Sequence, residues 1–421
     1  MKIFLDSVGC RLNQAEIENL ARQFRAAGHQ IVANAAEADL AVVNTCSVTA
    51  QAAADSRAAL RRSGRLGAGE IVATGCWATL EPQAAAALPG VTRVILNAEK
   101  DTLVSTLFKT EPFDLEPLAR QPLPGLRQRT RAFIKVQDGC DNACTFCVTT
   151  LARGAARSRP LAEVLDDICY ALDGGVQEIV LTGVHLGAWG KDLGLPLRHL
   201  IDSILKQTDV PRLRLSSLEP WDLTEDFFSL WENKRLMPHL HLPLQSGSAP
   251  VLRRMARKTT PEAFAALVES ARRHIPGLAV TTDVIAGFPG ETEAEFAESL
   301  EFIRRMAFAG GHAFTYSPRP GTAAARMRGQ VRPEVRKDRT RILRQTFEAA
   351  AQAYRRNFLG GRLSVLWEST SALGQSGWQM EGLSGNYIRV TAVAPEPRWN
   401  YIDDVELTGL TENGLLGTIT L

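Results

Sequence analysis

Three cysteines in one short segment constrain this chain more than any other feature of its sequence. Cys140, Cys144 and Cys147 are spaced four and three residues apart, in a stretch that also contains Gly139 and Asn142. Thiolates at this spacing can bind one metal centre, but tetrahedral zinc usually takes a fourth protein ligand nearby, and none follows. A cubane iron–sulfur cluster tolerates the gap because an external molecule can bind its fourth iron. The segment therefore predicts an iron–sulfur site with one open iron.

Composition indicates a globular protein with free thiols. The chain has 421 residues, of which 45% are hydrophobic, so we expect two or three domains. Its seven cysteines are an odd number and too scattered for a secreted disulfide framework. The start, Met1 to Asp6, lacks a signal-peptide pattern, and no apolar run is long enough to span a bilayer. We therefore expect a cytoplasmic protein that does not associate with membranes.

The first hundred residues alternate short apolar strands with helices. We expect strands at 2–6, 40–44, 70–74 and 91–96, and helices at 14–27, 49–62 and 82–87. This βαβ rhythm predicts a parallel sheet with covering helices, and hence an α/β fold.

Three more cysteines come just after strands of this predicted sheet. Cys10, Cys46 and Cys76 each follow one strand, and the carboxyl ends of parallel strands meet at a crevice where ligands bind. Three unrelated thiols are the alternative, since cysteine is often simply buried. Recurrence at one structural position favours a shared metal site. The seventh cysteine, Cys169, falls within a predicted helix, where we expect a buried apolar residue.

The remaining chain divides into three parts. Four prolines between residues 110 and 130 indicate a linker, which we place at 113–130, after the first domain, 1–112. Residues 131–358 repeat strand and helix about six times, which predicts a partial (β/α)6 barrel. Residues 359–421 contain only short strands and turns, which predicts a small all-β barrel.

At this point the chain resembles a known family. The three-cysteine segment is similar to that of the radical S-adenosylmethionine (SAM) enzymes, and Phe146 matches the aromatic residue that they place near the adenine of SAM. From end to end, the chain resembles the methylthiotransferases. The first domain matches their cluster domain, the partial barrel their radical SAM domain, and the C-terminal module their RNA-binding TRAM domain.

The family contains branches with different substrates. They act on isopentenyladenosine in tRNA, on threonylcarbamoyladenosine in tRNA, or on an aspartate of a ribosomal protein. Segments 8–14, 44–49 and 135–140 resemble the threonylcarbamoyladenosine branch, above all in the pair Gln137–Asp138, while Val148–Leu151 departs from the family's aliphatic–Pro–aromatic stretch. The resemblance implies a methylthio group installed at C2 of N6-threonylcarbamoyladenosine-37, next to the anticodon. The other two substrates stay open, as does an RNA-binding protein with structural zinc.

The resemblance also implies cofactors and partners. It implies two 4Fe–4S clusters, on Cys140, Cys144 and Cys147 and on Cys10, Cys46 and Cys76. The first would bind SAM and generate a 5′-deoxyadenosyl radical, and the second would hold the sulfur that is methylated and delivered. The implied partners are the anticodon stem-loop of a tRNA, an electron donor such as flavodoxin or ferredoxin, and a sulfur source.

Further candidates for SAM binding follow the strands of the predicted barrel, whose chemistry belongs at strand carboxyl ends. Besides Phe146, they are Thr182, Gly183, Glu219, Gln245 and Asp283. Turns at strand ends with a capping role are the alternative for each of them.

Basic clusters provide the candidates for RNA binding. They include Arg153, Arg157, Arg159, Arg254 and Arg389, which could follow a phosphate backbone, although a charge run is usually just a solvated face. Trp367 and Tyr387 of the C-terminal module could stack on unpaired bases or could fill the core of the barrel.

Overall fold

The computed structural model describes residues 1–108, 130–372 and 377–420. Its contacts divide the chain into two compact units: unit 1 consists of Met1–Asn142, Cys147–Gly174 and Thr182–Leu195, and unit 2 of Ala143–Phe146, Gly175–Leu181 and Pro196–Leu421. The predicted linker at 113–130 lies outside the described residues, except for Thr130. Within the described ranges, no helix is both long and apolar enough to cross a membrane.

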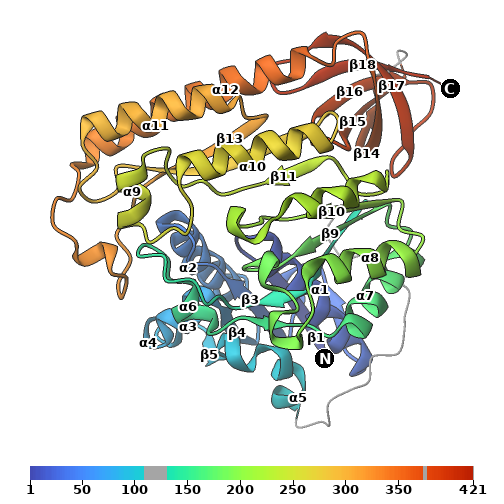
Figure 1. The fold of residues 1–421 in the computed structure, drawn as a ribbon. Helices are drawn as coiled ribbons and strands as arrows, with labels where there is room; N and C mark the ends of the chain where they lie inside the picture. Colours follow the sequence, from blue (N-terminus) through green and yellow to red (C-terminus); the bar gives the residue numbers. More distant parts are fainter. Residues whose placement is uncertain (109–129, 373–376, 421) are drawn as a thin grey trace. The chain divides into compact units, whose positions relative to one another are not determined.

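A five-stranded parallel sheet forms the first part of unit 1 (Figure 1). Its order is β2 (Gln30–Val32), β1 (Lys2–Ser7), β3 (Leu40–Thr45), β4 (Glu70–Gly75) and β5 (Val91–Val94), and every pairing is parallel. The intervening helices are α1 (Arg11–Ala26), α2 (Ala50–Arg65), α3 (Cys76–Leu80) and α4 (Pro82–Ala86), and α5 (Leu103–Phe108) follows. The predicted rhythm is confirmed, and the structure adds β2, α3 and α5 to it.

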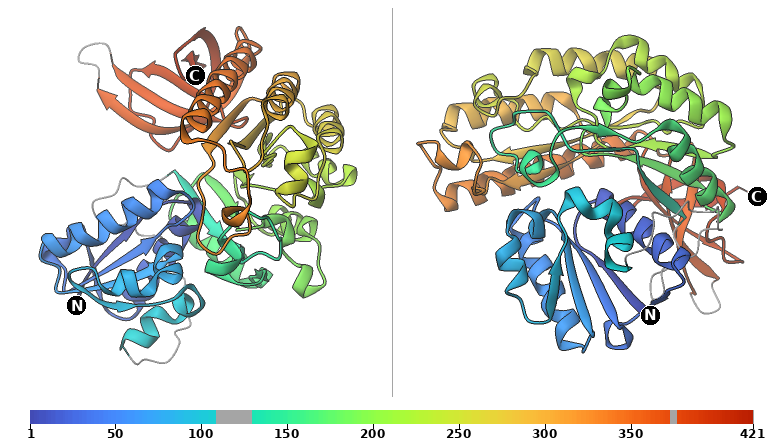
Figure 2. Two further views of the ribbon diagram at one scale, coloured as in Figure 1. Left: turned by 90° about the vertical axis from the view of Figure 1, so that its left-hand side faces the viewer. Right: turned by 90° about the horizontal axis from the view of Figure 1, so that it is seen from below.

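Both faces of this sheet are buried, because successive side chains of a strand point to opposite sides. On the central strand β3, Leu40 and Val42 belong to one apolar cluster with residues of α1, while Ala41 and Val43 belong to another with residues of α2. Figure 2 shows helices on both sides of the sheet. A sheet covered in this way leaves the ends of its strands as the place where polar side chains can collect.

The rest of unit 1 surrounds the segment that contains Cys140. It comprises β6 (Arg131–Lys135), β7 (Gln137–Asp138), α6 (Thr149–Arg153), β8 (Arg157–Ser158) and α7 (Leu161–Asp173), followed by two short 3-10 turns. Strand β6 packs against α1 of the N-terminal sheet. Strands β7 and β8 pair antiparallel, so the segment between them, which contains Cys140, begins and ends at neighbouring residues.

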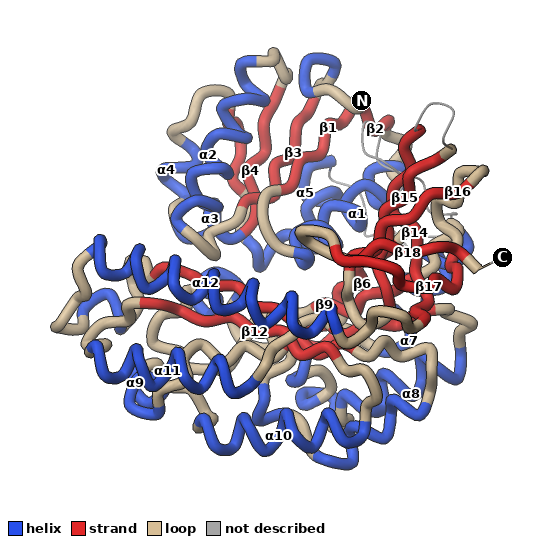
Figure 3. Tube along the Cα trace, turned by 90° about the horizontal axis from the view of Figure 1, so that it is seen from above, coloured by secondary structure: helices blue, strands red, loops and turns tan. Residues whose placement is uncertain are grey.

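Unit 2 contains further parallel strands. They are β9 (Glu178–Thr182, its last residue in unit 1), β10 (Arg212–Leu215), β11 (His239–His241), β12 (Ala279–Ala286) and β13 (Gly310–Thr315). The helices are α8 (Leu197–Gln207), α9 (Ala249–Arg254), α10 (Pro261–His274), α11 (Glu293–Met306) and α12 (Pro333–Arg356). Helix α12 packs along β12 (Figure 3) and along β13 (labelled in Figure 1). These strands and helices supply repeats of the predicted partial barrel.

A closed five-stranded barrel ends the chain, as predicted. Its order is β14 (Arg362–Ala372), β15 (Trp378–Ser384), β16 (Arg389–Ala394), β18 (Leu415–Ile419) and β17 (Ile402–Leu410). Trp367 is fully buried in the barrel core, so it fills the core and does not offer its ring to a base. Tyr387 stacks on His239 at 4.4 Å between ring centroids.

Buried arginines join this barrel to the parallel strands of unit 2. The guanidinium of Arg214 donates to both carboxylate oxygens of Glu178, at 2.7 and 3.1 Å, and to the carbonyl oxygen of Gly385 at 2.9 Å. Arg212 donates to the carbonyl oxygens of Leu383 and Ser364, at 3.0 and 2.7 Å. Burial lowers the pKa of Arg212 to about 10. Because the carbonyl acceptors belong to β14, β15 and the turn after β15, these bonds fix the barrel on β9 and β10.

We expect Glu178→Ala to destabilise unit 2 by about 3–5 kcal/mol, because Arg214 would keep a buried charge without its carboxylate partner. Both side chains are 0% exposed. This loss of stability is measured as the change in the free energy of unfolding, obtained from a urea titration that is monitored by tryptophan fluorescence. Glu301→Ala is the matched control, since Glu301 is 76% exposed and 3.9 Å from Arg304, and should cost about 0–1 kcal/mol. Equal effects of the two substitutions would contradict the prediction.

Candidate functional site

Three cysteines lie at adjacent strand ends of the N-terminal sheet. Cys10 follows β1 and is the N-cap residue of α1, Cys46 directly follows β3, and Cys76 directly follows β4. Because β1, β3 and β4 are neighbours in the sheet, the three residues leave it at the same edge. Cys46 is buried, Cys76 is half-buried and Cys10 is exposed.

The thiols are close enough to influence one another. Gly9 has a φ of +104°, and a Cβ atom at this position would lie 2.4 Å from Cys46 Sγ, so the loop after β1 can approach Cys46 only with glycine there. Burial raises the pKa of Cys46, and Cys10 and Cys76 raise it further. Desolvation by neighbouring atoms also raises the pKa of Cys10, although part of this residue reaches solvent.

Asn13 fixes the loops that carry two of these cysteines. Its Nδ2 donates to the carbonyl oxygens of Val8 and Thr45, at 2.8 and 3.0 Å. Its Oδ1 lies 3.7 Å from Cys10 Sγ and accepts from it. Since Thr45 immediately precedes Cys46, the buried amide of Asn13 fixes the loop of Cys10 and the loop of Cys46 relative to each other.

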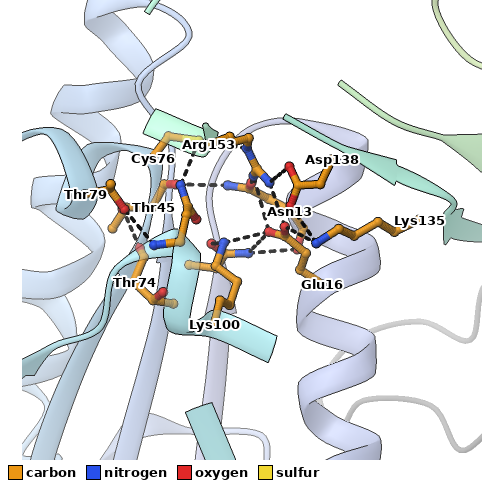
Figure 4. Close-up of polar contacts among 12 residues, drawn as sticks. Asn13, Glu16, Thr45, Thr74, Cys76, Thr79, Lys100, Lys135, Asp138 and Arg153 are labelled. Carbon is orange, nitrogen blue, oxygen red and sulfur yellow. Dashed lines mark hydrogen bonds and ion pairs between the residues drawn. The ribbon is translucent and has the colours of Figure 1, made fainter. Parts of the chain in front are cut away.

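A buried ion network lies beside these cysteines (Figure 4). The carboxylate of Glu16 on α1 contacts three cations: Arg153 at 2.7 Å, Lys100 at 2.8 Å and Lys135 at 3.4 Å. The carboxylate of Asp138 contacts Lys135 at 2.7 Å and Arg153 at 3.0 Å. Burial by itself would raise the pKa of Glu16, but the three cations hold it well below its usual range. The network therefore keeps a carboxylate ionised that has almost no contact with solvent.

Arg153 extends this network to the cysteines. Its Nε donates to Cys76 Sγ at 3.2 Å, and its other N–H groups donate to Asn13, Glu16 and Asp138. These five bonds use all the donors of a guanidinium. The residue is only 5% exposed. The prediction that Arg153 binds an RNA phosphate would therefore require one of these bonds to break first.

The segment before Cys140 forms a tight turn around a buried glutamine. Gln137 is fully buried, and its Nε2 donates to the carbonyl oxygens of Asp138 and Gly139, at 2.8 and 2.9 Å. Its Oε1 accepts from the backbone N–H of His185 at 2.8 Å. Gly139 has a φ of +68°, and a Cβ atom there would lie 1.8 Å from the carbonyl oxygen of Ala155. Only glycine allows the chain to pass this close.

Several donors surround the sulfur atoms of Cys140, Cys144 and Cys147. In unit 1, the backbone N–H of Asn142 donates to Cys140 Sγ and that of Thr149 donates to Cys147 Sγ, each at 3.4 Å. Cys144 belongs to unit 2, where Arg257 donates to its Sγ at 3.8 Å. Hydrogen bonds of this kind stabilise the thiolate form, which is the form that binds iron.

Comparisons with known proteins agree with this arrangement. Two family models match the chain: the Radical SAM superfamily at residues 134–303 and the uncharacterized protein family UPF0004 at residues 2–97. The threonylcarbamoyladenosine tRNA methylthiotransferase MtaB of Bacillus subtilis is 35% identical over 91% of this chain and 88% of its own. The protein of the same name from Thermotoga maritima is 37% identical over 86% of each chain. The chain belongs to the methylthiotransferase family of radical SAM enzymes.

Other relatives and solved structures are also similar. A tRNA-2-methylthio-N(6)-dimethylallyladenosine synthase of Erythrobacter litoralis is 33% identical over 88% of this chain and 89% of its own. The radical SAM methyltransferase TsrM from Kitasatospora setae, solved with cobalamin and a [4Fe–4S] cluster, superposes with a TM-score of 0.58 at 16% identity over 77% of each chain. This last similarity concerns the fold alone. As a methylthiotransferase, the protein is an enzyme whose cofactors are SAM and 4Fe–4S clusters.

The donor chemistry of the cysteines is the one that iron–sulfur clusters use. Over residues 1–108, 130–372 and 377–420, no group of three or more His, Cys, Asp or Glu side chains is arranged to hold one metal ion. A four-iron cluster takes each thiolate on a different iron, so its ligands stand farther apart than those of one ion. An all-thiol donor set, with N–H groups directed at the sulfur atoms, suits such a cluster in both cysteine groups.

The predicted SAM contacts are placed in both units. In unit 1, Thr182 is buried and Gly183 packs on Gln137, whose Oε1 would lie 3.0 Å from an added Cβ. In unit 2, Phe146 packs edge-on against Phe288 at 6.4 Å between centroids. Their role in binding SAM stays a prediction.

The other three candidates lie within unit 2. Both carboxylate oxygens of Glu219 accept from Arg257, at 3.1 and 2.6 Å, so Glu219 is tied to the arginine that contacts Cys144. Gln245 has a φ of +72°. Its backbone N–H donates to the carbonyl oxygen of Asp283 on β12, and its carbonyl oxygen accepts from the N–H of Ile285 on the same strand. Asp283 lies 3.3 Å from His241 Nε2, while its Oδ1 is buried without a hydrogen-bond partner.

The four other arginines predicted to bind RNA differ in their availability. Arg389 is exposed, and the side chain of Arg157 is 49% exposed, with its guanidinium at the longer distance of 3.7 Å from Asp138. Arg159 is paired with Asp167 at 2.6 Å, and Arg254 donates to both oxygens of the Glu295 carboxylate, at 2.9 and 2.8 Å. An RNA phosphate would have to compete with these carboxylates, so Arg157 and Arg389 are the better candidates.

Sequence analysis missed part of the site. Glu16 and Lys100 were not predicted to be functional, although an acidic residue on the apolar face of α1 was a usable signal. The prediction for Cys169 was wrong, because this residue is exposed on α7. A periodicity that assigns a helix does not determine which of its faces meets solvent at every position.

We expect Gly139→Ala to prevent iron binding by Cys140, Cys144 and Cys147, because the new methyl group would overlap the carbonyl of Ala155. Gly194→Ala is the matched control, since Gly194 has the same φ of +68° with nothing within 4 Å of an added Cβ. Iron and sulfide assays after anaerobic reconstitution measure the effect. Equal iron content in the two variants would show that the close approach is not required.

Proposed function

We propose that this enzyme installs a methylthio group at C2 of N6-threonylcarbamoyladenosine-37 in tRNA, using two 4Fe–4S clusters. The observation that carries the proposal is the second group of cysteines, Cys10, Cys46 and Cys76, at adjacent strand ends in addition to the segment of Cys140. A radical SAM enzyme that only cleaves SAM needs one cluster. A second all-thiol site supports a reaction that also transfers sulfur.

The protein residues have separate tasks in this proposal. Cys140, Cys144 and Cys147 would hold one cluster, and Cys10, Cys46 and Cys76 the other. With both clusters and SAM bound, the cofactors supply a 5′-deoxyadenosyl radical and the sulfur atom. The chain itself positions the thiolates, through Asn13 and Gln137, and balances their charge through buried cations.

The substrate assignment rests on two observations. Four curated relatives named as threonylcarbamoyladenosine tRNA methylthiotransferases are 33–37% identical to this chain over most of its length. The pair that resembles this branch most, Gln137 and Asp138, has defined contacts with the turn before Cys140 and with the ion network. Dimethylallyladenosine-type relatives at 33% identity keep isopentenyladenosine as the second candidate substrate.

Partners and further contacts complete the proposal. The tRNA anticodon stem-loop would contact Arg157 and Arg389 and the C-terminal barrel, which is the proposed TRAM domain at 359–421. We place the cluster domain at 1–112 and the radical SAM domain at 131–358. The reaction needs a one-electron donor such as flavodoxin or ferredoxin and a sulfur source, in the cytoplasm where tRNA is modified.

We expect roughly eight iron and eight sulfide per chain after anaerobic reconstitution, and about four of each in either triple variant. The first variant is Cys10→Ala/Cys46→Ala/Cys76→Ala and the second is Cys140→Ala/Cys144→Ala/Cys147→Ala. The control, Cys169→Ala, should keep both clusters because this cysteine is exposed and far along α7. A second triple variant without iron would refute the two-cluster assignment.

We expect deletion of the gene to remove 2-methylthio-N6-threonylcarbamoyladenosine from tRNA and leave its unmethylthiolated precursor. Mass spectrometry of tRNA nucleosides measures both. The wild-type gene should restore the modified nucleoside, and Cys76→Ala should not. Loss of 2-methylthio-isopentenyladenosine instead would transfer the assignment to the other tRNA branch, and intact tRNA would point to a ribosomal protein.

A further inference from the structure

One arginine joins the helix that follows Cys147 to a cysteine of the N-terminal group, within unit 1. Arg153 ends α6, six residues after Cys147 in the sequence. Its Nε donates to Cys76 Sγ at 3.2 Å, and the adjacent Ala152 carbonyl accepts from Asn97, whose Nδ2 also lies 3.7 Å from Cys76 Sγ. The segment that begins at Cys147 therefore ends in contact with Cys76, which follows strand β4 of the N-terminal sheet.

The ion network around Arg153 has an excess of positive charge. Three buried cations, Arg153, Lys100 and Lys135, face two buried carboxylates, Glu16 and Asp138. Toward solvent, Lys135 also lies 3.8 Å from Asp101, and Asp138 lies 3.7 Å from Arg157. Four cations then face three carboxylates, so one positive charge is unbalanced when all seven are ionised. The side chains of Arg153, Lys100 and Glu16 are at most 4% exposed, so water screens this charge little. Three thiolates on a four-iron core form an anionic assembly, which is the natural counterpart of this charge.

We propose that Arg153 is a positioning residue that raises the reduction potential of the cluster on Cys10, Cys46 and Cys76. It supplies the unbalanced positive charge and an N–H···S bond to the Cys76 ligand. Both stabilise the more negative, reduced form of a cluster, and both are known determinants of cluster potential. The inference rests on the proposed function, because it requires a cluster at these three cysteines.

The test uses the full chain with Cys140→Ala/Cys144→Ala/Cys147→Ala, which leaves only the N-terminal cluster. Its midpoint potential is measured by redox titration followed by electron paramagnetic resonance, together with iron content. Arg153→Gln removes the charge and the bond, and we expect it to shift the midpoint to a clearly lower potential. Arg153→Lys keeps the charge but loses the Nε donor. Its midpoint potential should therefore lie between those of the parent chain and Arg153→Gln.

A double variant separates the effect of charge on the midpoint potential from the effect of the hydrogen bond. It also shows whether the loss of Arg153 only prevents folding. Glu16→Gln/Arg153→Gln removes one carboxylate with the cation, so the excess positive charge is the same as in the parent chain while the bond to Cys76 is lost. We expect its midpoint above that of Arg153→Gln. Arg62→Gln is the control, because Arg62 pairs with Asp6 at 2.7 Å on the surface of the same unit and is 58% exposed. Its midpoint should equal that of the parent.

The outcomes distinguish this inference from the proposed function. A parent chain that binds no cluster refutes the two-cluster proposal and the role of Arg153 with it. A loaded cluster with the same midpoint in Arg153→Gln overturns only the role of Arg153. If Arg153→Lys, Arg153→Gln and the double variant all lose the cluster to the same extent, Arg153 serves folding alone and the inference is also overturned.

Discussion

The buried contact between Arg153 and Glu16 joins the segments of unit 1 that carry chemistry. Glu16 comes from α1 after Cys10, and Arg153 from α6 after Cys147. A buried ion pair loses hydration that its mutual attraction scarcely repays, so it persists only where each charge has further partners. Arg153 has five hydrogen bonds, and Glu16 has three cations. Such a network specifies one arrangement of the loops more than it adds to stability.

The same physical solution recurs in unit 2. Arg214 and Glu178 are fully buried, and the arginine also bonds to a backbone carbonyl after β15 of the C-terminal barrel. In each unit, a buried guanidinium with four or more hydrogen bonds joins segments that are distant in the sequence. Arginine suits this role because its planar fork presents several donors in fixed directions. The parallel strands supply the frame, and the arginines determine how the added segments attach to it.

Local patterns explain why much of the fold was predictable. Short apolar runs specify strands such as β3 and β4, and the strand ends then place Cys46 and Cys76 without any knowledge of tertiary contacts. The turn at Gly139 is equally local. Cys169 was misjudged for the opposite reason, because burial depends on what packs against a residue. For the same reason the burial of Arg153 was not foreseen, since the sequence near it looks like any basic loop.

The sequence by itself determined the chemistry, since the spacing of Cys140, Cys144 and Cys147 and the strand-end positions of Cys10, Cys46 and Cys76 are properties of the chain. The tertiary structure alone decided which polar residues serve those cysteines. Glu16 is 84 residues from Lys100 and 137 residues from Arg153 along the chain, and each of these contacts joins two buried charges. A buried charge finds its partner through space, because the cost of leaving it unpaired depends on the local exclusion of water and not on separation along the chain.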